Sequence, residues 1–143
     1  MKESIGNDSE KAGAGILIVC KPTKKILLGL RSGGDQSNTW CIFGGHLKNQ
    51  EMPLNGAIRE TFEESELIPD EIISSPLHTN ITDDGFKYYT FLGFFDKERE
   101  PRINNEHLST GWFGFDELDG LNLHTEFKKS LTPKNIELIN HML

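Results

Sequence analysis

Residues 45–67 read GHLKNQEMPLNGAIRETFEESEL, and this stretch predicts the clearest helix of the chain. A proline at position 53 suits the first turn of a helix. Apolar side chains then recur at i, i+4 and i+8, which is typical of an amphipathic helix: Leu54, Ile58 and Phe62. We therefore predict a helix over residues 53–66, and we expect its apolar stripe to anchor it to a sheet.

The opposite face of this helix is acidic. Glu60, Glu63 and Glu64 lie at i, i+3 and i+4, so these carboxylates span roughly 100° of one face. An acidic face turned to water is the ordinary explanation of such a pattern. Here Glu66 adds a charge near the negative pole of the helix dipole, and each like-charge pair costs roughly a few tenths of a kcal/mol. A divalent cation would reverse this cost, and hard oxygen ligands favour Mg²⁺ or Mn²⁺.

The same segment resembles the Nudix signature, G-x5-E-x7-R-E-U-x-E-E-x-G-U, in which U is a bulky aliphatic residue. The chain matches its first glycine and all its charged positions at the same spacing: Gly45, Glu51, Arg59, Glu60, Glu63 and Glu64. Thr61 replaces an aliphatic residue, and Glu66 replaces the glycine that follows the helix. Phe43 stands where a proline is usual. These departures concern packing and the end of the helix, and they remove no metal ligand.

The resemblance implies a metal site on this helix. Glu60, Glu63 and Glu64 would hold a Mg²⁺ ion, which Mn²⁺ can replace. The main-chain carbonyl oxygen of Gly45 would be a further ligand. One carboxylate would act as the general base that removes a proton from the attacking water, and three residues are open as candidates: Glu60, Glu64 and Glu106.

Arg59 and Glu51 have implied roles in supporting this site. Arg59 would pair with a carboxylate of the signature and fix its rotamer, and an ordinary i, i+4 ion pair with Glu63 is the alternative. Glu51 would secure the preceding loop against the helix. The alternative for Glu51 is a solvated loop residue.

Four further residues are candidate substrate contacts: Arg31, Trp40, His46 and His107. Arg31 begins a Gly-rich loop and can reach a phosphate. Trp40 can stack on a base, although aromatic residues in strands more often belong to the core. His46 follows the double glycine. Glu106 and His107 precede an aromatic strand, a place from which related enzymes send a carboxylate to the metal; a polar surface loop is the alternative.

The rest of the chain alternates strand and helix signals. Strands are expected from apolar, β-branched or aromatic runs at residues 14–20, 25–30, 39–43, 72–82, 86–95 and 111–115. The sequence DDG at residues 83–85 predicts a hairpin turn. Residues 133–143 predict a C-terminal helix packed by Ile136, Leu138 and Ile139. This order predicts an α/β (α+β) domain, and the resemblance implies a Nudix-type α/β/α sandwich around a mixed β-sheet.

Length and composition indicate one domain. We expect it at residues 12–143, behind a flexible N-terminal tail at residues 1–11. The net charge of −7 argues against broad nucleic-acid binding, because phosphate backbones attract positive surfaces. No apolar run is long enough to cross a membrane. Cys20 and Cys41 show no metal-ligand spacing, so we expect free thiols in a cytoplasmic protein.

The resemblance implies Mg²⁺-dependent hydrolysis of a phosphoanhydride bond in a nucleoside diphosphate-X substrate. The partner would be a small-molecule nucleotide, with nucleoside triphosphates, nucleotide sugars, ADP-ribose and dinucleoside polyphosphates all open, and the chain would be a monomer or a homodimer. One alternative is C–O hydrolysis of a GDP-mannose-type nucleotide sugar with His107 as base. Another is a nucleotide-binding module without catalysis. The complete set of carboxylates favours attack at phosphorus.

Overall fold

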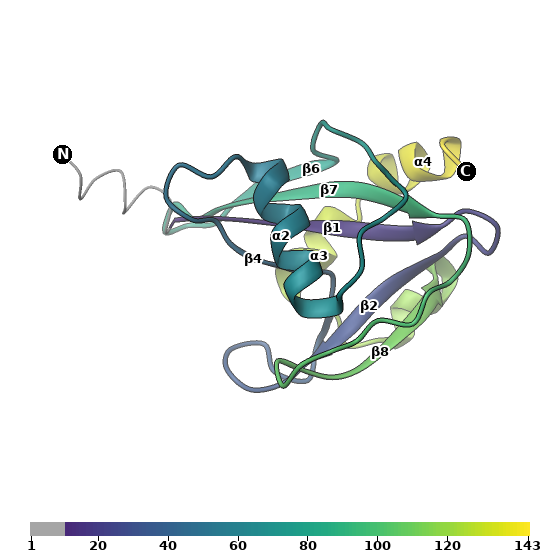
Figure 1. The fold of residues 1–143 in the computed structure, drawn as a ribbon. Helices are drawn as coiled ribbons and strands as arrows, with labels where there is room; N and C mark the ends of the chain where they lie inside the picture. The colour runs from purple at the N-terminus through teal and green to yellow at the C-terminus, as the bar shows by residue number, and fades with distance from the viewer. Residues whose placement is uncertain (1–10) are drawn as a thin grey trace.

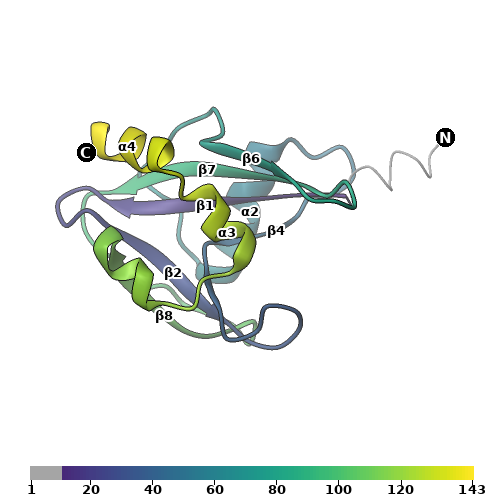
Figure 2. The same cartoon turned by 180° about the vertical axis from the view of Figure 1, so that it is seen from behind.

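The computed structural model describes residues 11–143, so most of the expected N-terminal tail lies outside it. A mixed sheet of eight strands forms the centre of this part of the chain. Helix α2 (Pro53–Ser65) covers one face of the sheet (Figure 1). Helices α3 (Thr125–Ser130) and α4 (Pro133–His141) lie on the other face, seen from behind in Figure 2. The predicted α/β/α sandwich around a mixed sheet is confirmed.

Eight strands build the sheet: β1 (Ala12–Cys20), β2 (Lys25–Arg31), β3 (Trp40–Cys41), β4 (Phe43–His46), β5 (Glu71–Ile72), β6 (His78–Ile81), β7 (Lys87–Phe95) and β8 (His107–Gly114). Strand β1 runs parallel to β7 along its whole length and antiparallel to β2 and β4. Strand β8 pairs with β2 in a register that sets Arg31 opposite His107. The pairings therefore bring the double glycine of β4 and the start of β8 to the same region of the sheet.

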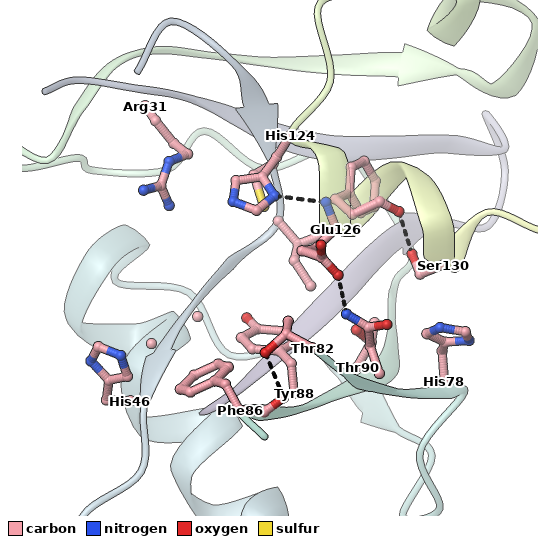
Figure 3. A pocket seen from close by; sticks show the side chains of 16 residues that line it. Arg31, His46, His78, Thr82, Phe86, Tyr88, Thr90, His124, Glu126 and Ser130 are labelled. Atoms are coloured by element: carbon pink, nitrogen blue, oxygen red, sulfur yellow. Dashed lines mark hydrogen bonds between the residues drawn. The ribbon is translucent and has the colours of Figure 1, made fainter. Parts of the chain in front are cut away.

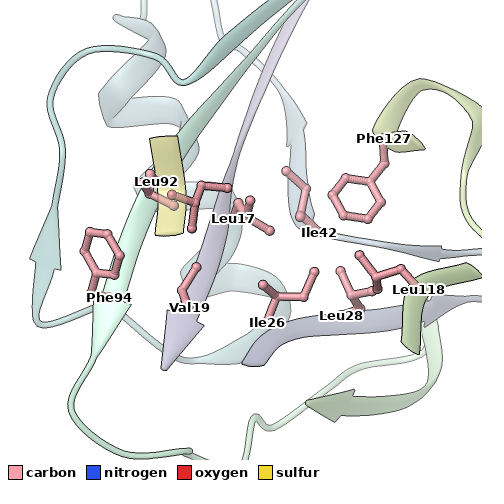
Figure 4. Packing of buried hydrophobic residues seen from close by; sticks show 10 residues of the cluster. Leu17, Val19, Ile26, Leu28, Ile42, Leu92, Phe94, Leu118 and Phe127 are labelled. Atoms are coloured by element: carbon pink, nitrogen blue, oxygen red, sulfur yellow. The ribbon is translucent and has the colours of Figure 1, made fainter. Parts of the chain in front are cut away.

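Apolar side chains on both faces of β1 explain why two hydrophobic cores form. Alternate residues of a strand point to opposite faces. Ile16 and Ile18 face α2 and pack with Phe43 and Ala57. On the other face, Leu17 and Val19 pack in a second cluster, shown in Figure 4, which extends to residues on the α3 side of the sheet. A strand buried on both sides reads as a continuous apolar run, as this one does.

Helix α2 turns a different face to the sheet from the one that the sequence predicts. Phe62, expected in the anchoring stripe, is 47% exposed. The buried residues of α2 are instead small or polar: Gly56, Ala57, Thr61, Glu64 and Ser65. The predicted stripe drifts around the helix, because eight residues at 100° each amount to about 80° beyond two full turns. Leu54 and Ile58 therefore still pack on the core, whereas Phe62 points away from it. Small inward residues let the helix approach β4 closely and bring Glu64 inside.

Several other elements agree with prediction only in part. The hairpin turn at residues 83–85 is confirmed, with Thr82 N–H donating to Phe86 O at 2.9 Å. Helix α4 buries Ile139 as expected, but Leu138 is 45% exposed. Strand β8 begins four residues before the predicted 111–115, and the sequence patterns missed α3 and a 3-10 helix, η1 (Phe115–Gly120). Cys20 and Cys41 are free, as predicted. Within residues 11–143, no helix has both the length and the apolarity required of a membrane span.

The C-terminal end of α2 keeps the backbone form of a glycine cap without the glycine. Glu66 adopts φ 60° and ψ 25°, and its N–H donates to Phe62 O. This left-handed conformation costs an L-residue with a side chain roughly 1–2 kcal/mol, which glycine does not incur. The Glu66 carboxylate has only a distant, exposed ion pair with Arg102 at 3.8 Å, and such pairs add little stability.

We predict that Glu66→Gly raises the free energy of unfolding by about 0.5–1 kcal/mol, because relief of backbone strain exceeds the entropy that glycine gains in the unfolded chain. Chemical denaturation measures the change. The matched control is Glu66→Ala, which removes the ion pair and keeps the strain, so it should not stabilise the chain. A glycine variant no more stable than the alanine variant contradicts this account of the cap.

Candidate active site

Two of the predicted metal ligands face the double glycine of β4. Glu64 Oε1 accepts a hydrogen bond from Gly44 N–H at 3.1 Å. The Glu60 carboxylate lies so close to Gly45 that an added Cβ would collide with it. A side chain at Gly45 would displace the Glu60 carboxylate from its present position beside the double glycine.

Glu106, at the entrance to β8, joins this group. Its carboxyl group hydrogen-bonds to Glu64, and Ser32 N–H donates to Glu106 O at 3.0 Å, which ties the β8 entrance to the end of β2. Burial raises the pKa of Glu64 to about 8, and the hydrogen bond to Glu106 and the negative charges of Glu106 and Glu60 add to the effect. Burial, together with these two neighbouring carboxylates, therefore favours the protonated form of Glu64 near neutral pH.

The chemistry of these donors fits a hard dication. The carboxylates and the Gly45 carbonyl are all oxygen ligands of the kind that Mg²⁺ prefers. A dication would also neutralise the negative charges that repel one another around Glu64. The side chains are not yet gathered on one point: among residues 11–143, no three His, Cys, Asp or Glu side chains are arranged to hold a metal ion directly. Glu63, the third predicted helix ligand, is 53% exposed and pairs with Arg59 at 3.2 Å.

Arg59 is the centre of a network that joins the loop to the helix. Its Nε and Nη2 donate to the two oxygens of Glu51 at 2.8 and 2.9 Å. Its Nη1 donates to Glu60 at 2.9 Å, and Nη2 also donates to His46 O at 3.0 Å. The hydrogen bond from Arg59 lowers the pKa of Glu51, which therefore remains ionised. The geometry of Arg59 and Glu51 matches the supporting roles that the sequence predicts, since they orient Glu60 and hold the preceding loop.

A small cavity of about 200 Å³ opens beside Glu64 and Glu106, and two predicted substrate contacts line it, Arg31 and His107. Within the described residues, Arg31 Nε and His107 Nδ1 are buried without a hydrogen-bond partner. Burial lowers the pKa of His107, whose ring lies edge-on to Phe43 with centroids 4.9 Å apart. Both side chains therefore line the cavity beside Glu64 and Glu106, and each keeps one buried polar atom without a partner.

A larger cavity of about 300 Å³ adjoins the first, because Arg31, Ile42 and Gly44 line both. His46 lies on its wall, as expected for a substrate contact (Figure 3). Trp40 packs against Phe113 at 4.9 Å and lines neither of these cavities, so the geometry does not support its predicted contact with substrate. Sequence patterns did not single out most of the polar wall, which comes from β6 and α3: His78, Asn80, His124, Glu126 and Ser130. These residues are dispersed in the chain and show no motif spacing.

The raised pKa of Glu64 makes a pH-dependent prediction. A carboxyl group that ionises at higher pH in the folded state stabilises the fold at low pH and loses that contribution as pH rises through the folded pKa. In EDTA, the unfolding free energy of the wild type should therefore fall relative to Glu64→Gln by on the order of 1–3 kcal/mol between about pH 4.5 and 8. Denaturation curves across this range measure the difference, with the exposed Glu66→Gln as control. A pH-independent difference would show that Glu64 ionises normally.

Comparison with known proteins assigns this site to a family. A family model described as NUDIX domain matches residues 10–134. A curated Bifidobacterium longum protein, named nucleoside triphosphate pyrophosphatase/Nudix hydrolase fusion protein, is 31% identical over 97 residues, covering 65% of this chain and 20% of the relative. The chain thus spans about a fifth of that relative's length.

Solved structures share the fold. A C. elegans Ap4A hydrolase binary complex superposes with TM-score 0.73 and 18% identity over 92% of this chain and 99% of the other. The Nudix hydrolase RenU from M. smegmatis gives 0.74 and 19% over 94% and 88%. At this level of identity the superpositions show a common fold and no more. The family model covers most of the sequence, signature helix included, and the chain belongs to the NUDIX domain family.

Proposed function

We propose that the chain hydrolyses a phosphoanhydride bond in a nucleoside diphosphate-X substrate, in a reaction that requires Mg²⁺. The observation that carries this proposal is that Glu64 and Glu106 line a small cavity, with Glu60 nearby at Gly45, and that this cavity continues into a second one large enough for an organic group. Family membership supports it, as does the name of the B. longum relative, a pyrophosphatase/Nudix hydrolase fusion.

Glu60, Glu64 and the Gly45 carbonyl would hold the metal, with Glu63 joining them if its side chain leaves Arg59. When bound, Mg²⁺ would neutralise the phosphate oxygens and lower the pKa of a coordinated water. Mn²⁺ accepts the same ligands and should replace it. The metal would also explain how a chain of net charge −7 binds an anionic substrate.

The side chains around the metal site have separate tasks in this proposal. Glu106 accepts the proton of the attacking water, because it lies on the small cavity and, once a metal holds Glu64 ionised, no longer shares a proton with it. Arg31 binds a phosphate oxygen through its guanidinium group, from a position common to both cavities. Arg59 keeps Glu60 in its rotamer from behind.

The cavity limits the part of the substrate that it encloses. At about 300 Å³ it lies at the small end of the range for ligand pockets, enough for one base or sugar rather than two nucleosides. Nucleoside triphosphates and nucleotide sugars are therefore the favoured substrates. ADP-ribose and dinucleoside polyphosphates such as Ap4A would leave their second half outside the cavity.

Glu64→Gln should lower kcat at least 100-fold while the chain remains folded, because it removes a metal ligand and the charge that the metal balances. Phosphate release from a panel of nucleotides, with Mg²⁺ and with EDTA, measures the effect, and circular dichroism checks the fold. Glu66→Gln, at the C-cap of the same helix, is the matched control, since its exposed side chain lines neither cavity. Activity that persists in EDTA, or normal turnover by Glu64→Gln, would contradict the proposal.

C–O hydrolysis of a nucleotide sugar is the second candidate, and the buried, free Nδ1 of His107 is the observation in its favour. Hydrolysis of a nucleotide sugar in ¹⁸O-labelled water separates the two reactions. Attack at phosphorus puts the label in a phosphate product, as we predict from the three carboxylates, whereas attack at carbon puts it in the released sugar. Label in the sugar would transfer the base role to His107.

A further inference from the structure

We propose that the larger cavity is a base-specificity site that selects guanine, and that Glu126, held in place by Asn80, makes the selection. The inference rests on the proposed function only in that the bound molecule is a nucleotide; it adds which nucleotide. It arises from a pair of polar side chains that the catalytic site does not use.

Glu126 and Asn80 come from two different elements in the wall of the larger cavity. Asn80 lies on β6 and Glu126 in the first turn of α3, and the Asn80 amide donates a hydrogen bond to Glu126 Oε1 (Figure 3). The main-chain N–H of Glu126 donates to His124 Nδ1 at 3.1 Å, which caps the helix and fixes the position of the Glu126 main chain. Lys129 Nζ approaches the other oxygen, Oε2, at 3.2 Å. The carboxylate is thus oriented by one contact at each of its two oxygens.

The Glu126 carboxylate presents acceptors only. The hydrogen bond from Asn80 lowers its pKa, so it remains ionised at neutral pH. Two carboxylate oxygens offer about four acceptor positions, and Asn80 and Lys129 take two of them. The remaining positions favour a ligand edge that carries two adjacent donors.

Among the common bases, only guanine has such an edge, formed by N1–H and the N2 amino group. Adenine and cytosine set a single amino donor beside a ring-nitrogen acceptor, and uracil sets one N–H between two carbonyl oxygens. In each of these three bases, an acceptor would face the Glu126 carboxylate and repel it. A hydrogen bond to a charged group contributes roughly 1.5–3 kcal/mol, so losing one should weaken binding at least tenfold.

The rest of the cavity suits a nucleotide whose flat base lies in the cavity and whose phosphates point toward Glu60 and Glu64. Phe86 and His46 pack edge to face at 5.5 Å on one side, and Arg31 and His124 lie on the other (Figure 3). Gly44 and Gly45 line the same cavity, and these two glycines also contact Glu64 and Glu60 respectively. A base that reaches Glu126 therefore leaves its phosphates near Arg31, the residue shared with the small cavity.

Isothermal titration calorimetry with GMP and AMP, which contain no phosphoanhydride, tests this inference on the full chain without turnover. We expect GMP to bind at least tenfold more tightly than AMP. Glu126→Gln replaces acceptors with an amide and should reduce the GMP preference at least tenfold. Glu137→Gln, on the exposed surface of α4, is the matched control and should keep it. Phe86→Ala should weaken both nucleotides by a similar factor, because stacking does not distinguish them.

Equal affinity for GMP and AMP, or a preference unchanged in a folded Glu126→Gln, would overturn the inference. So would the absence of measurable binding by either nucleotide. Selective GMP binding by a chain that hydrolyses no phosphoanhydride would support this inference while contradicting the proposed function. Hydrolysis without base preference would do the reverse.

Discussion

Glu64 and Glu60 lie against the backbone of Gly44 and Gly45, and Glu106 adds a second negative charge beside the buried Glu64. Glu64 is only 9% exposed, so water does little to screen it. The fold tolerates this arrangement in two ways: the raised pKa of Glu64 favours its neutral form, and Arg59 donates a hydrogen bond to the Glu60 carboxylate. A bound dication would take the place of both the proton on Glu64 and the hydrogen bond from Arg59. We predict that the buried acidic group lowers stability near neutral pH, and we propose that the same geometry serves to bind a metal ion and a phosphate.

The elements around this cluster each serve to keep it in position. The small inward face of α2 lets the helix lie close to β4, so that Glu64 reaches Gly44 N–H. Glu51 holds Arg59 with two hydrogen bonds and is itself fixed by Lys48 N–H at 2.8 Å. Pairing of β2 with β8 sets Arg31 opposite His107, next to Glu106. Residues more than seventy positions apart in the chain are therefore adjacent because the sheet register requires it.

The catalytic half of the site was predictable from sequence, because its residues lie on one helix at fixed spacing. Charges at Glu60, Glu63 and Glu64 follow helical geometry, and Arg59 and Glu51 follow the signature. The orientation of α2 was not predictable from the apolar stripe, since the burial of Glu64 and Thr61 depends on how closely β4 approaches. The larger cavity was not predictable either. Asn80 and Glu126 meet only through folding of β6 against α3, an element of six residues that carries no periodic signal.

Under the two proposals, phosphoanhydride hydrolysis and base selection occupy adjoining cavities that share Arg31. The central claim is that the acidic helix face holds a metal, and anomalous diffraction from a crystal soaked in Mn²⁺ tests it most directly. The account predicts an anomalous peak roughly 2.0–2.3 Å from oxygens of Glu60 and Glu64, with the Gly45 carbonyl at similar range. Those carboxylates splayed into solvent, with Mn²⁺ absent or bound elsewhere, would contradict it.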